Sequence, residues 1–408
     1  MMKKILTTLF AFIIIISSLN FSFGEGVTGV YGWTKHISAG ERWWTYIDSS
    51  ADGTKLVALL DQIFYNYIYT SVDGGKTWAT STSAGEKWWS SVTSSADGTK
   101  LAATGNYRDW DISEDFNYVY TSEDSGVTWA TSTSAGNRDW SSITYSSDGT
   151  KLIAAVDGGY IYISNDSGAT WATSTEAGER PWSSLTSSSD GTNLAAIDSY
   201  YDHNIQGYVS NIHFSTTSGA TWATSTFPEG QQLMRITSSS DGAKLAATVY
   251  DGYIYTSDDF GATWTERTSA GKRAWRSITS SNDGEILAAA LNSGYIYTSA
   301  DSGVTWTPET SLGINYWNSI VSSSDGTKFV VASNNTNNQD GYIYTYSSTV
   351  FKPTVISSVA SITSSTSIIF NGYVNTSHTT HGVEYCTTGS SNASCNFDTD
   401  SNVQKVEE

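Results

Sequence analysis

Short apolar runs alternate with polar, glycine-containing turns along most of the chain. Between residues 140 and 162, for example, the runs Trp140–Thr144, Leu152–Val156 and Tyr160–Tyr162 are separated by turns rich in Ser, Asp and Gly. Runs of this length, rich in aromatic and β-branched residues and bounded by such turns, are typical of β-strands. Few segments are long and apolar enough for an internal helix, so the pattern predicts an all-β fold.

An Asp-Gly turn follows the first strand of each repeated unit, and such a dipeptide between apolar runs is typical of a tight hairpin. The turn occurs seven times, with 42 to 51 residues between successive copies, beginning at Asp52, Asp97, Asp148, Asp190, Asp241, Asp283 and Asp325. Each unit has room for four short strands, which we name A to D in chain order. Units of about 42 residues with four strands predict the blades of a β-propeller, here seven.

A second motif, Ser-x-Asp-x-Gly-x-Thr-Trp, lies between strands C and D. It occurs at Ser71–Trp78, Ser122–Trp129, Ser164–Trp171, Ser257–Trp264 and Ser299–Trp306, and a sixth copy, Ser215–Trp222, has Thr217 in place of the Asp. The octet resembles the Asp-box (BNR) repeat of β-propeller proteins. The resemblance implies an architecture and leaves the activity open, because such propellers include sialidases, photosystem assembly factors and sortilin-type receptors.

The Asp-box residues are predicted to be structural. The Asp accepts backbone N–H bonds in the turn, the Gly supplies a positive φ, and the Trp fills space between blades. One carboxylate per box is too few for calcium, which takes six or more oxygen ligands. The residues concerned are Asp73, Asp124, Asp166, Asp259, Asp301, Trp78, Trp129, Trp171, Trp222, Trp264 and Trp306.

Six octets for seven Asp-Gly turns indicate how the ring closes. The last unit ends at Tyr342–Thr345 without an octet, whereas Gly32–Thr34 near the N-terminus resembles the start of a strand D. The N-terminal segment is therefore predicted to be the outer strand of the seventh blade, within a propeller spanning residues 27–347. Closure of this kind removes exposed sheet edges; an open solenoid of the same repeats is the alternative.

The turns between strands B and C and the linkers between strands D and A are predicted to share one face of the propeller, because strands in a blade alternate in direction. Two B–C loops, Gly105–Asn117 and Asp198–Asn211, are nine residues longer than in the 42-residue units. Function concentrates on loops held by a rigid scaffold. We therefore predict ligand-binding residues on these loops: Arg108, Trp110, Tyr200 and Tyr201.

The D–A linkers carry a basic residue shortly before a Trp in five of the seven units, which predicts a ring of cations and Trp around the channel mouth. Trp faces can stack on sugars, and Arg can grip carboxylates; the alternative is packing that each repeat encodes for itself, with Arg stacked on the neighbouring Trp and paired with the preceding Glu. The fourth-to-fifth linker departs from the rule with Met234-Arg235 in place of the Trp. The candidate cations are Arg42, Arg138, Arg180, Arg273 and Arg235.

Three functions are compatible with these features: a non-catalytic protein that binds a protein or glycan through the B–C/D–A face, a glycoside hydrolase, and a purely structural surface repeat. A hydrolase needs two carboxylates facing across a cleft. Candidate acids are Asp109, Asp111, Glu114 or Asp115 facing Asp198 or Asp202. The Arg-Ile-Pro motif of sialidases is absent. No cofactor motif and no metal site is recognisable, so the sequence favours the non-catalytic function and a monomeric propeller.

The N-terminal residues 1–24 resemble a secretory signal peptide, with Lys3 and Lys4 before an apolar core and small residues before a cleavage site after Gly24. This predicts a secreted, periplasmic or cell-surface protein with no other membrane span. The net charge of −19 argues against nucleic acid as a partner. After a linker at 348–353, residues 354–408 resemble part of a fibronectin type III-like module, a truncated β-sandwich, in which Cys386 and Cys395 are disulfide candidates.

Overall fold

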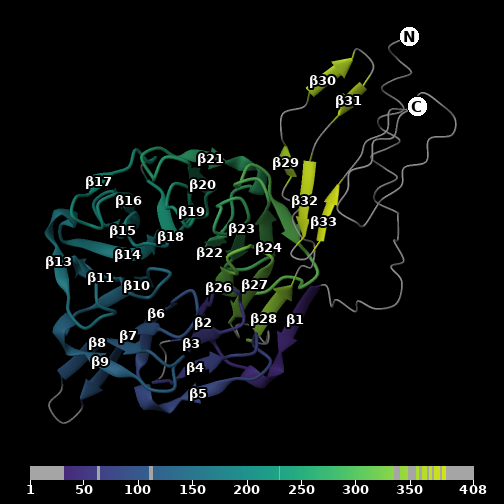
Figure 1. Ribbon diagram of the computed structural model, residues 1–408. Coiled ribbons are helices and arrows are strands. Elements are labelled where there is room, and N and C mark those ends of the chain that lie inside the picture. The colour runs from purple at the N-terminus through teal and green to yellow at the C-terminus, as the bar shows by residue number, and fades with distance from the viewer. Residues whose placement is uncertain are drawn as a thin grey trace. The chain divides into compact units, whose positions relative to one another are not determined.

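A computed structural model describes residues 32–61, 65–109, 114–228, 230–334 and 341–347, together with the backbone of five short strands between 355 and 382. The predicted signal peptide, the linker at 348–353, Cys386 and Cys395 lie outside the described residues, as do Trp110, Asp111 and the side chains of Arg108, Asp109 and Glu114. Residues 32–347 form a ring of antiparallel four-stranded blades (Figure 1).

Six blades are each built from four consecutive strands. The first blade is β2 (Trp44–Ser49), β3 (Leu56–Leu60), β4 (Ile68–Ser71) and β5 (Ala79–Ser81); the second is β6 (Trp88–Ser94), β7 (Leu101–Asp109), β8 (Glu114–Ser122) and β9 (Ala130–Ser132). The third is β10 (Trp140–Tyr145), β11 (Leu152–Gly159), β12 (Ile161–Ser164) and β13 (Ala172–Ser174); the fourth is β14 (Arg180–Ser187), β15 (Leu194–Asp202), β16 (Gly207–Ser215) and β17 (Ala223–Thr224). The fifth is β18 (Gln232–Ser238), β19 (Leu245–Tyr250), β20 (Ile254–Ser257) and β21 (Thr265–Arg267); the sixth is β22 (Trp275–Ser280), β23 (Leu287–Leu291), β24 (Ile296–Ser299) and β25 (Thr307–Glu309).

The remaining blade is closed by the two ends of the propeller. The strands β26 (Trp317–Ser322), β27 (Lys328–Ser333) and β28 (Ile343–Ser347) are completed by β1 (Gly32–His36), which pairs with β28 in the register Gly32↔Ser347 to His36↔Ile343. His36 Nε2 also lies 2.7 Å from Thr345 Oγ1. The predicted all-β propeller with an N-terminal outer strand is therefore confirmed, and the open solenoid is not formed.

Short 3₁₀ helices connect strand D of one blade to strand A of the next. They are η2 (Ile37–Ala39), η3 (Thr82–Ala84), η4 (Thr133–Ala135), η5 (Thr175–Ala177) and η6 (Thr268–Ala270). Each is followed by a glycine with positive φ, such as Gly136 at 80°. No described helix has the length and apolarity needed to cross a membrane.

A closed ring of seven backbone hydrogen bonds joins all the A–B turns. In each turn, an N–H donates to the carbonyl of the corresponding residue in the next blade, from Ala51 to Ala96 and onward until Ser324 donates back to Ala51, with distances of 2.7–2.8 Å. The Asp-Gly turns beside this ring are close-packed: a Cβ at Gly149, where φ is +67°, would lie 2.7 Å from Lys100 Cδ of the preceding blade. Both the backbone conformation and the available space therefore require glycine there.

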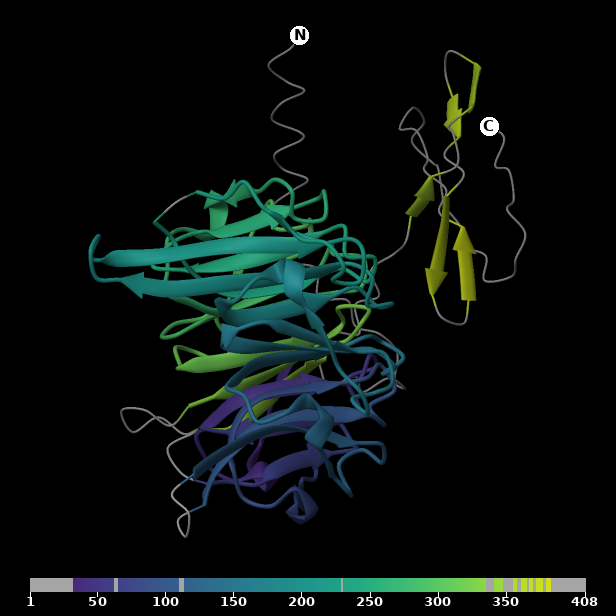
Figure 2. The ribbon, with the colours of Figure 1, turned by 90° about the vertical axis from the view of Figure 1, so that its left-hand side faces the viewer.

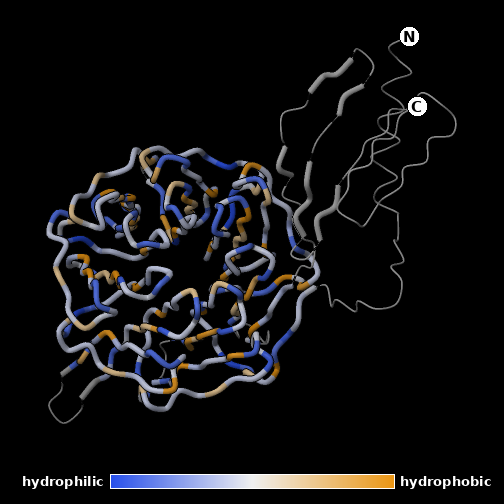
Figure 3. Tube along the Cα trace, in the orientation of Figure 1, coloured by the Kyte–Doolittle hydropathy of each residue, from blue (hydrophilic) through white to orange (hydrophobic). Residues whose placement is uncertain are grey.

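The hydrophobic core consists of seven clusters, each between two neighbouring blades. The cluster between the first and second blades, for instance, joins Val57, Leu59 and Ile68 to Trp89 and Leu101. Apolar residues accordingly occur around the whole ring (Figure 3). Burial between blades means that no blade can bury its apolar faces alone, which makes the ring one cooperative unit.

The Asp boxes have the predicted structural role. In the second blade, Asp124 accepts hydrogen bonds from the N–H and the hydroxyl of Thr128, and Ser122 Oγ accepts from the Gly126 N–H. Trp129 Nε1 donates to Ser81 Oγ of the first blade, so the box also joins neighbouring blades. In the sixth copy, Thr217 Oγ1 replaces the carboxylate as the acceptor of the Thr221 N–H.

We predict that Phe260→Asn increases the stability of the propeller. Phe260 precedes the glycine of the Asp box in the fifth blade with φ of 60°, where the other boxes have Ser or Gly, and the residue is 38% exposed. Aromatic residues are disfavoured in this left-handed region, whereas Asn tolerates it. The free energy of unfolding should rise by about 0.5–1 kcal/mol, measured by urea denaturation; Phe260→Ala, which keeps the strain, should give no increase.

The described backbone of the C-terminal segment consists of five short strands. Its described backbone forms a three-stranded sheet of β29 (Val355–Ser357), β32 (Gly372–Thr376) and β33 (Thr379–Gly382), and a hairpin of β30 (Ser361–Ser364) and β31 (Ser367–Ile369). The match to a fibronectin type III-like module finds no further support in these strands and stays a prediction.

Candidate functional site

The two long B–C connections are extended β-ribbons rather than the predicted loops. Strands β7 and β8 pair from Leu101↔Ser122 to Asp109↔Glu114, and β15 and β16 pair from Leu194↔Ser215 to Asp202↔Gly207. In both units the additional residues lengthen the two paired strands of the hairpin. Figure 2 shows the β15–β16 ribbon projecting beyond the rest of its blade.

Exposed apolar side chains gather at the end of the β15–β16 ribbon. Tyr200 and Tyr201 are each 44% exposed, Tyr208 is 36% exposed, and Ile205 in the connecting turn is 63% exposed. The Tyr201 ring packs edge-on against Tyr208, with the ring centroids 5.3 Å apart. The predicted candidates Tyr200 and Tyr201 are thus accessible, on the part of the ribbon where β14 no longer pairs with β15.

A buried ionic network lies at the base of this ribbon. Asp198, whose side chain is 3% exposed, accepts hydrogen bonds from the N–H and the side-chain amide of Asn211 and lies 3.0 Å from His213 Nε2. Arg180 NH1 is 3.4 Å from the same carboxylate. Burial would raise the pKa of Asp198, but the bonds from His213 and Asn211 outweigh it and hold the pKa below its usual value. Asp198, a candidate hydrolase acid in the sequence, is therefore sealed into the blade.

The linker arginines form the same local contact in each repeat. Arg42, Arg138, Arg180 and Arg273 each donate Nε–H to the carbonyl of the Ala that ends the preceding 3₁₀ helix. The guanidinium groups of all but Arg180 lie over the Tyr of strand C in the same blade, as Arg138 does over Tyr162 at 4.5 Å. These contacts are the local packing that the alternative expected, although for three of the four residues the partner is a Tyr and not a Trp; ligand binding by these residues stays a prediction.

The strand-A tryptophans do not ring a channel mouth. Trp44, Trp89, Trp140, Trp182, Trp275 and Trp317 are at most 2% exposed and lie in the clusters between blades. Each strand-A Trp is an apolar side chain at the start of an inner strand, and burial against the preceding blade removes more of its surface from water than a position at the axis could. In the fifth blade the equivalent residue is Leu233, not Met234-Arg235, and Phe227 packs against Tyr255 nearby.

Three residues of the inner strands instead meet near the axis. Arg235 NH2 donates to Tyr46 Oη at 3.1 Å, although the two residues belong to the fifth and first blades, which are not neighbours. Arg276 of the sixth blade is close enough to interact electrostatically with both. Arg235 was a sequence candidate; Tyr46 and Arg276 were missed, although both depart from Ser at their places in the strand-A pattern.

Asp48 is an inner-strand carboxylate that gives a pH-dependent prediction. It accepts the backbone N–H of Ser94 in the next blade at 2.8 Å, and burial raises its pKa to about 6. Because the folded pKa exceeds the unfolded one, stability should fall as pH rises from about 4 to about 6, on the order of 2 kcal/mol.

The control for Asp48 is the variant Asp48→Thr, since Thr93 occupies the same place in the second blade and accepts the Tyr145 N–H. This variant should be more stable than the wild type at pH 7 and should lose the slope between pH 4 and 6, measured by urea denaturation. An unchanged slope would contradict the prediction.

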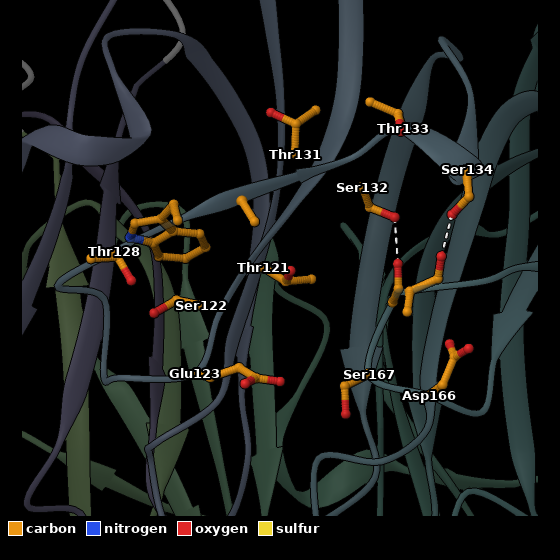
Figure 4. Close-up of a pocket in the computed structure, with 14 residues that line it drawn as sticks. Thr121, Ser122, Glu123, Thr128, Thr131, Ser132, Thr133, Ser134, Asp166 and Ser167 are labelled. Carbon is orange, nitrogen blue, oxygen red and sulfur yellow. Dashed lines mark hydrogen bonds between the residues drawn. The ribbon is translucent and has the colours of Figure 1, made fainter.

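A groove lies between the Asp boxes of the second and third blades. Its volume is about 490 Å³ and its lining includes Glu123, Trp129 and Asp166 (Figure 4). Ser132 and Ser134 donate across it to the carbonyls of Gly168 and Ala169. The same serine bond joins Ser174 to Gly219 in the next blade junction, so the groove belongs to the repeated scaffold.

Among the described residues, no group of three or more His, Cys, Asp or Glu side chains is placed to hold a metal ion.

Comparison with known proteins supports the repeat and the architecture. A family profile, the BNR-Asp box repeat, matches residues 254–267. No curated protein sequence matches the chain. The chain is thus a β-propeller with BNR/Asp-box repeats, and the likenesses that follow are between folds.

Among solved structures, one of YCF48 bound to D1 peptide aligns with a TM-score of 0.58 and 15% identity, over 81% of this chain and 99% of that one. YCF48 from Cyanidioschyzon merolae aligns with a TM-score of 0.58 and 15% identity, over 77% and 98%. A GH74 xyloglucanase from Xanthomonas campestris aligns with a TM-score of 0.56 and 14% identity, over 74% of this chain and 52% of that one.

Proposed function

We propose that this chain is an exported, non-catalytic binding protein that uses the face carrying the two β-ribbons to bind a protein partner. The single observation that carries the proposal is the cluster of exposed aromatic and aliphatic side chains on the β15–β16 ribbon, around Tyr201, Tyr208 and Ile205. Exposed Tyr residues on a rigid element supply contact area at low conformational cost and are enriched at protein interfaces.

One of the comparisons is consistent with a protein ligand. The YCF48 structure contains a D1 peptide on a propeller of this kind, which makes peptide binding compatible with the architecture. The xyloglucanase likeness is at the level of fold alone. Asp198 is a poor candidate for a hydrolase acid, because its carboxylate is buried and bonded to His213, Asn211 and Arg180.

The test is selection of a displayed random-peptide library on the propeller. Peptides selected on the wild type are then measured against the ribbon variant Tyr201→Ser/Tyr208→Ser. We expect the affinity to fall at least tenfold, because each Tyr removes a large apolar contact.

The matched control for the ribbon is Val72→Ser/Val304→Ser. It removes two exposed apolar side chains, 65% and 52% exposed, from the opposite, Asp-box face, and peptide affinity should be retained. Selected peptides that bind the ribbon variant as well as the wild type would refute the proposal. A glycan array run on the same proteins, with Trp110→Ala/Tyr201→Ala, tests the carbohydrate alternative.

A further inference from the structure

The inner strands follow a common pattern, Trp-Ser-Ser-Ile/Val-Thr-Ser, in which the serines bond to backbone groups. The second-position Ser141 and Ser183 donate to carbonyls of strand B, and the third-position Ser91 and Ser142 accept N–H groups of the next inner strand. Side chains at these two positions therefore bond the inner strands to strand B of the same blade and to the inner strand of the next blade. A large charged residue at either place cannot make the same short bond and must extend elsewhere.

The departures from this pattern are concentrated in the first, fifth and sixth blades. Tyr46 and Arg235 replace the third-position Ser, and Arg276 replaces the second-position Ser. The Tyr46–Arg235 hydrogen bond connects blades that are not neighbours, so these two side chains reach over the axis toward each other. The Arg235 guanidinium carbon also lies 5.6 Å from the centre of the Tyr46 ring.

Arg276 lies beside this pair with its hydrogen-bonding capacity unused. The side chain is half-buried, and no described residue forms a hydrogen bond or ion pair with its guanidinium. The titratable groups close enough to act on it electrostatically are Arg235, Tyr46, Asp61 and Tyr250. Burial, with the neighbouring Arg235 charge, lowers the pKa of Arg276. A guanidinium carries five N–H donors, and a half-buried one beside a like charge is poised for an added anion.

We propose that Arg235 and Arg276, with the Tyr46 hydroxyl, form an axial site that binds a carboxylate group of a protein partner. Two guanidinium charges and the single Asp61 carboxylate leave a net charge of +1 at the site, which one monoanionic carboxylate neutralises. The planar fork of Arg matches a carboxylate in two-point geometry. A dianionic phosphate would leave an uncompensated charge facing Asp61.

This site rests on the proposed function only in that the carboxylate belongs to a protein partner. Arg276 lies on an inner strand immediately after the D–A linker, so the site and the β-ribbons belong to the same face of the propeller. A peptide could contact the ribbon aromatics and place an acidic group at the axis. The site itself can be tested with small anions, without any partner.

The experiment follows the arginine side-chain NMR signals of the full chain during titration with sodium acetate and, separately, inorganic phosphate, at constant ionic strength set with chloride. We expect acetate to shift the Nε–H signals of Arg235 and Arg276 saturably, and the variant Arg276→Ser to weaken acetate binding at least tenfold. Ser is the residue of the second, third and fourth blades at this place (Ser90, Ser141, Ser183), so the variant should fold. The control Arg138→Lys changes a linker cation that lies over Tyr162 and should bind acetate normally.

Two peptides then test whether the site binds a C-terminal carboxylate or an Asp side chain. One ends in a free carboxylate, and the other is amidated and contains a single Asp; tighter binding of either than of an amidated peptide without Asp supports the site. No saturable shift with acetate, tighter binding of phosphate, or unchanged binding by Arg276→Ser would overturn it. If library selection on the ribbon succeeds and these titrations fail, the axial-site proposal is refuted and the proposed function is not.

Discussion

Asp198→Val is expected to lower the free energy of unfolding by about 3–5 kcal/mol, because it removes one partner of a buried ionic network. His213 Nε2 would lose its acceptor at 3.0 Å, and Arg180 and the amide of Asn211 would lose theirs. His213 is 3% exposed and cannot turn to water for a replacement. Urea denaturation monitored by tryptophan fluorescence measures the loss.

The repeats themselves supply the control for this variant. The places of Asp198 and His213 are occupied by Val156 and Tyr162 in the third blade and by Val249 and Tyr255 in the fifth. The double variant Asp198→Val/His213→Tyr should therefore recover most of the stability that Asp198→Val loses, with an interaction free energy of about 2–3 kcal/mol. Additive effects of the two substitutions would show that the pair is not coupled.

Trp44→Ala is expected to cost about 3–5 kcal/mol, since the ring is fully buried between the seventh and first blades. The ring packs edge-on against Tyr69 at 5.2 Å and beside Trp78 at 5.9 Å. Its removal leaves a cavity that the paired strands on either side cannot close, and it weakens the junction between the seventh and first blades.

The adjacent Trp43 is the matched control for Trp44. It is 38% exposed, so Trp43→Ala should change the free energy of unfolding by less than about 1 kcal/mol. The two variants delete the same side chain one residue apart, so composition and unfolded-state effects are nearly equal. Equal losses in urea denaturation would contradict burial between blades as the source of the stability.

The architecture follows from short-range signals in the sequence. Asp-Gly turns and Asp boxes specify local turn geometry, and their spacing alone indicates the number of strands per blade and the N-terminal closing strand. The ribbons were expected as loops because their added residues, such as Tyr200 and Tyr201, interrupt the repeat spacing, and spacing does not record whether extra residues pair with each other.

The candidate site depends on contacts between residues that are not adjacent in the sequence. The linker arginines lie near Trp in the chain, but the folded blade places the guanidinium groups of Arg42, Arg138 and Arg273 over a Tyr of strand C. Asp198 and His213 are fifteen residues apart and meet only because β15 and β16 pair. Alignment of the seven units against one another, position by position, would have singled out Asp198, His213, Tyr46 and Arg276 as departures.

The ring of seven backbone hydrogen bonds at the A–B turns limits how such a protein can diversify. A chain with six or eight units would have to change the angle between all blades before the last turn could donate back to the first, so the number of repeats cannot vary gradually. The B–C connections take no part in this ring, and β15–β16 is lengthened without disturbing it. New binding surfaces can therefore arise by lengthening the B–C hairpins on one face, while the hydrogen-bonded A–B turns on the other face keep the number of blades at seven.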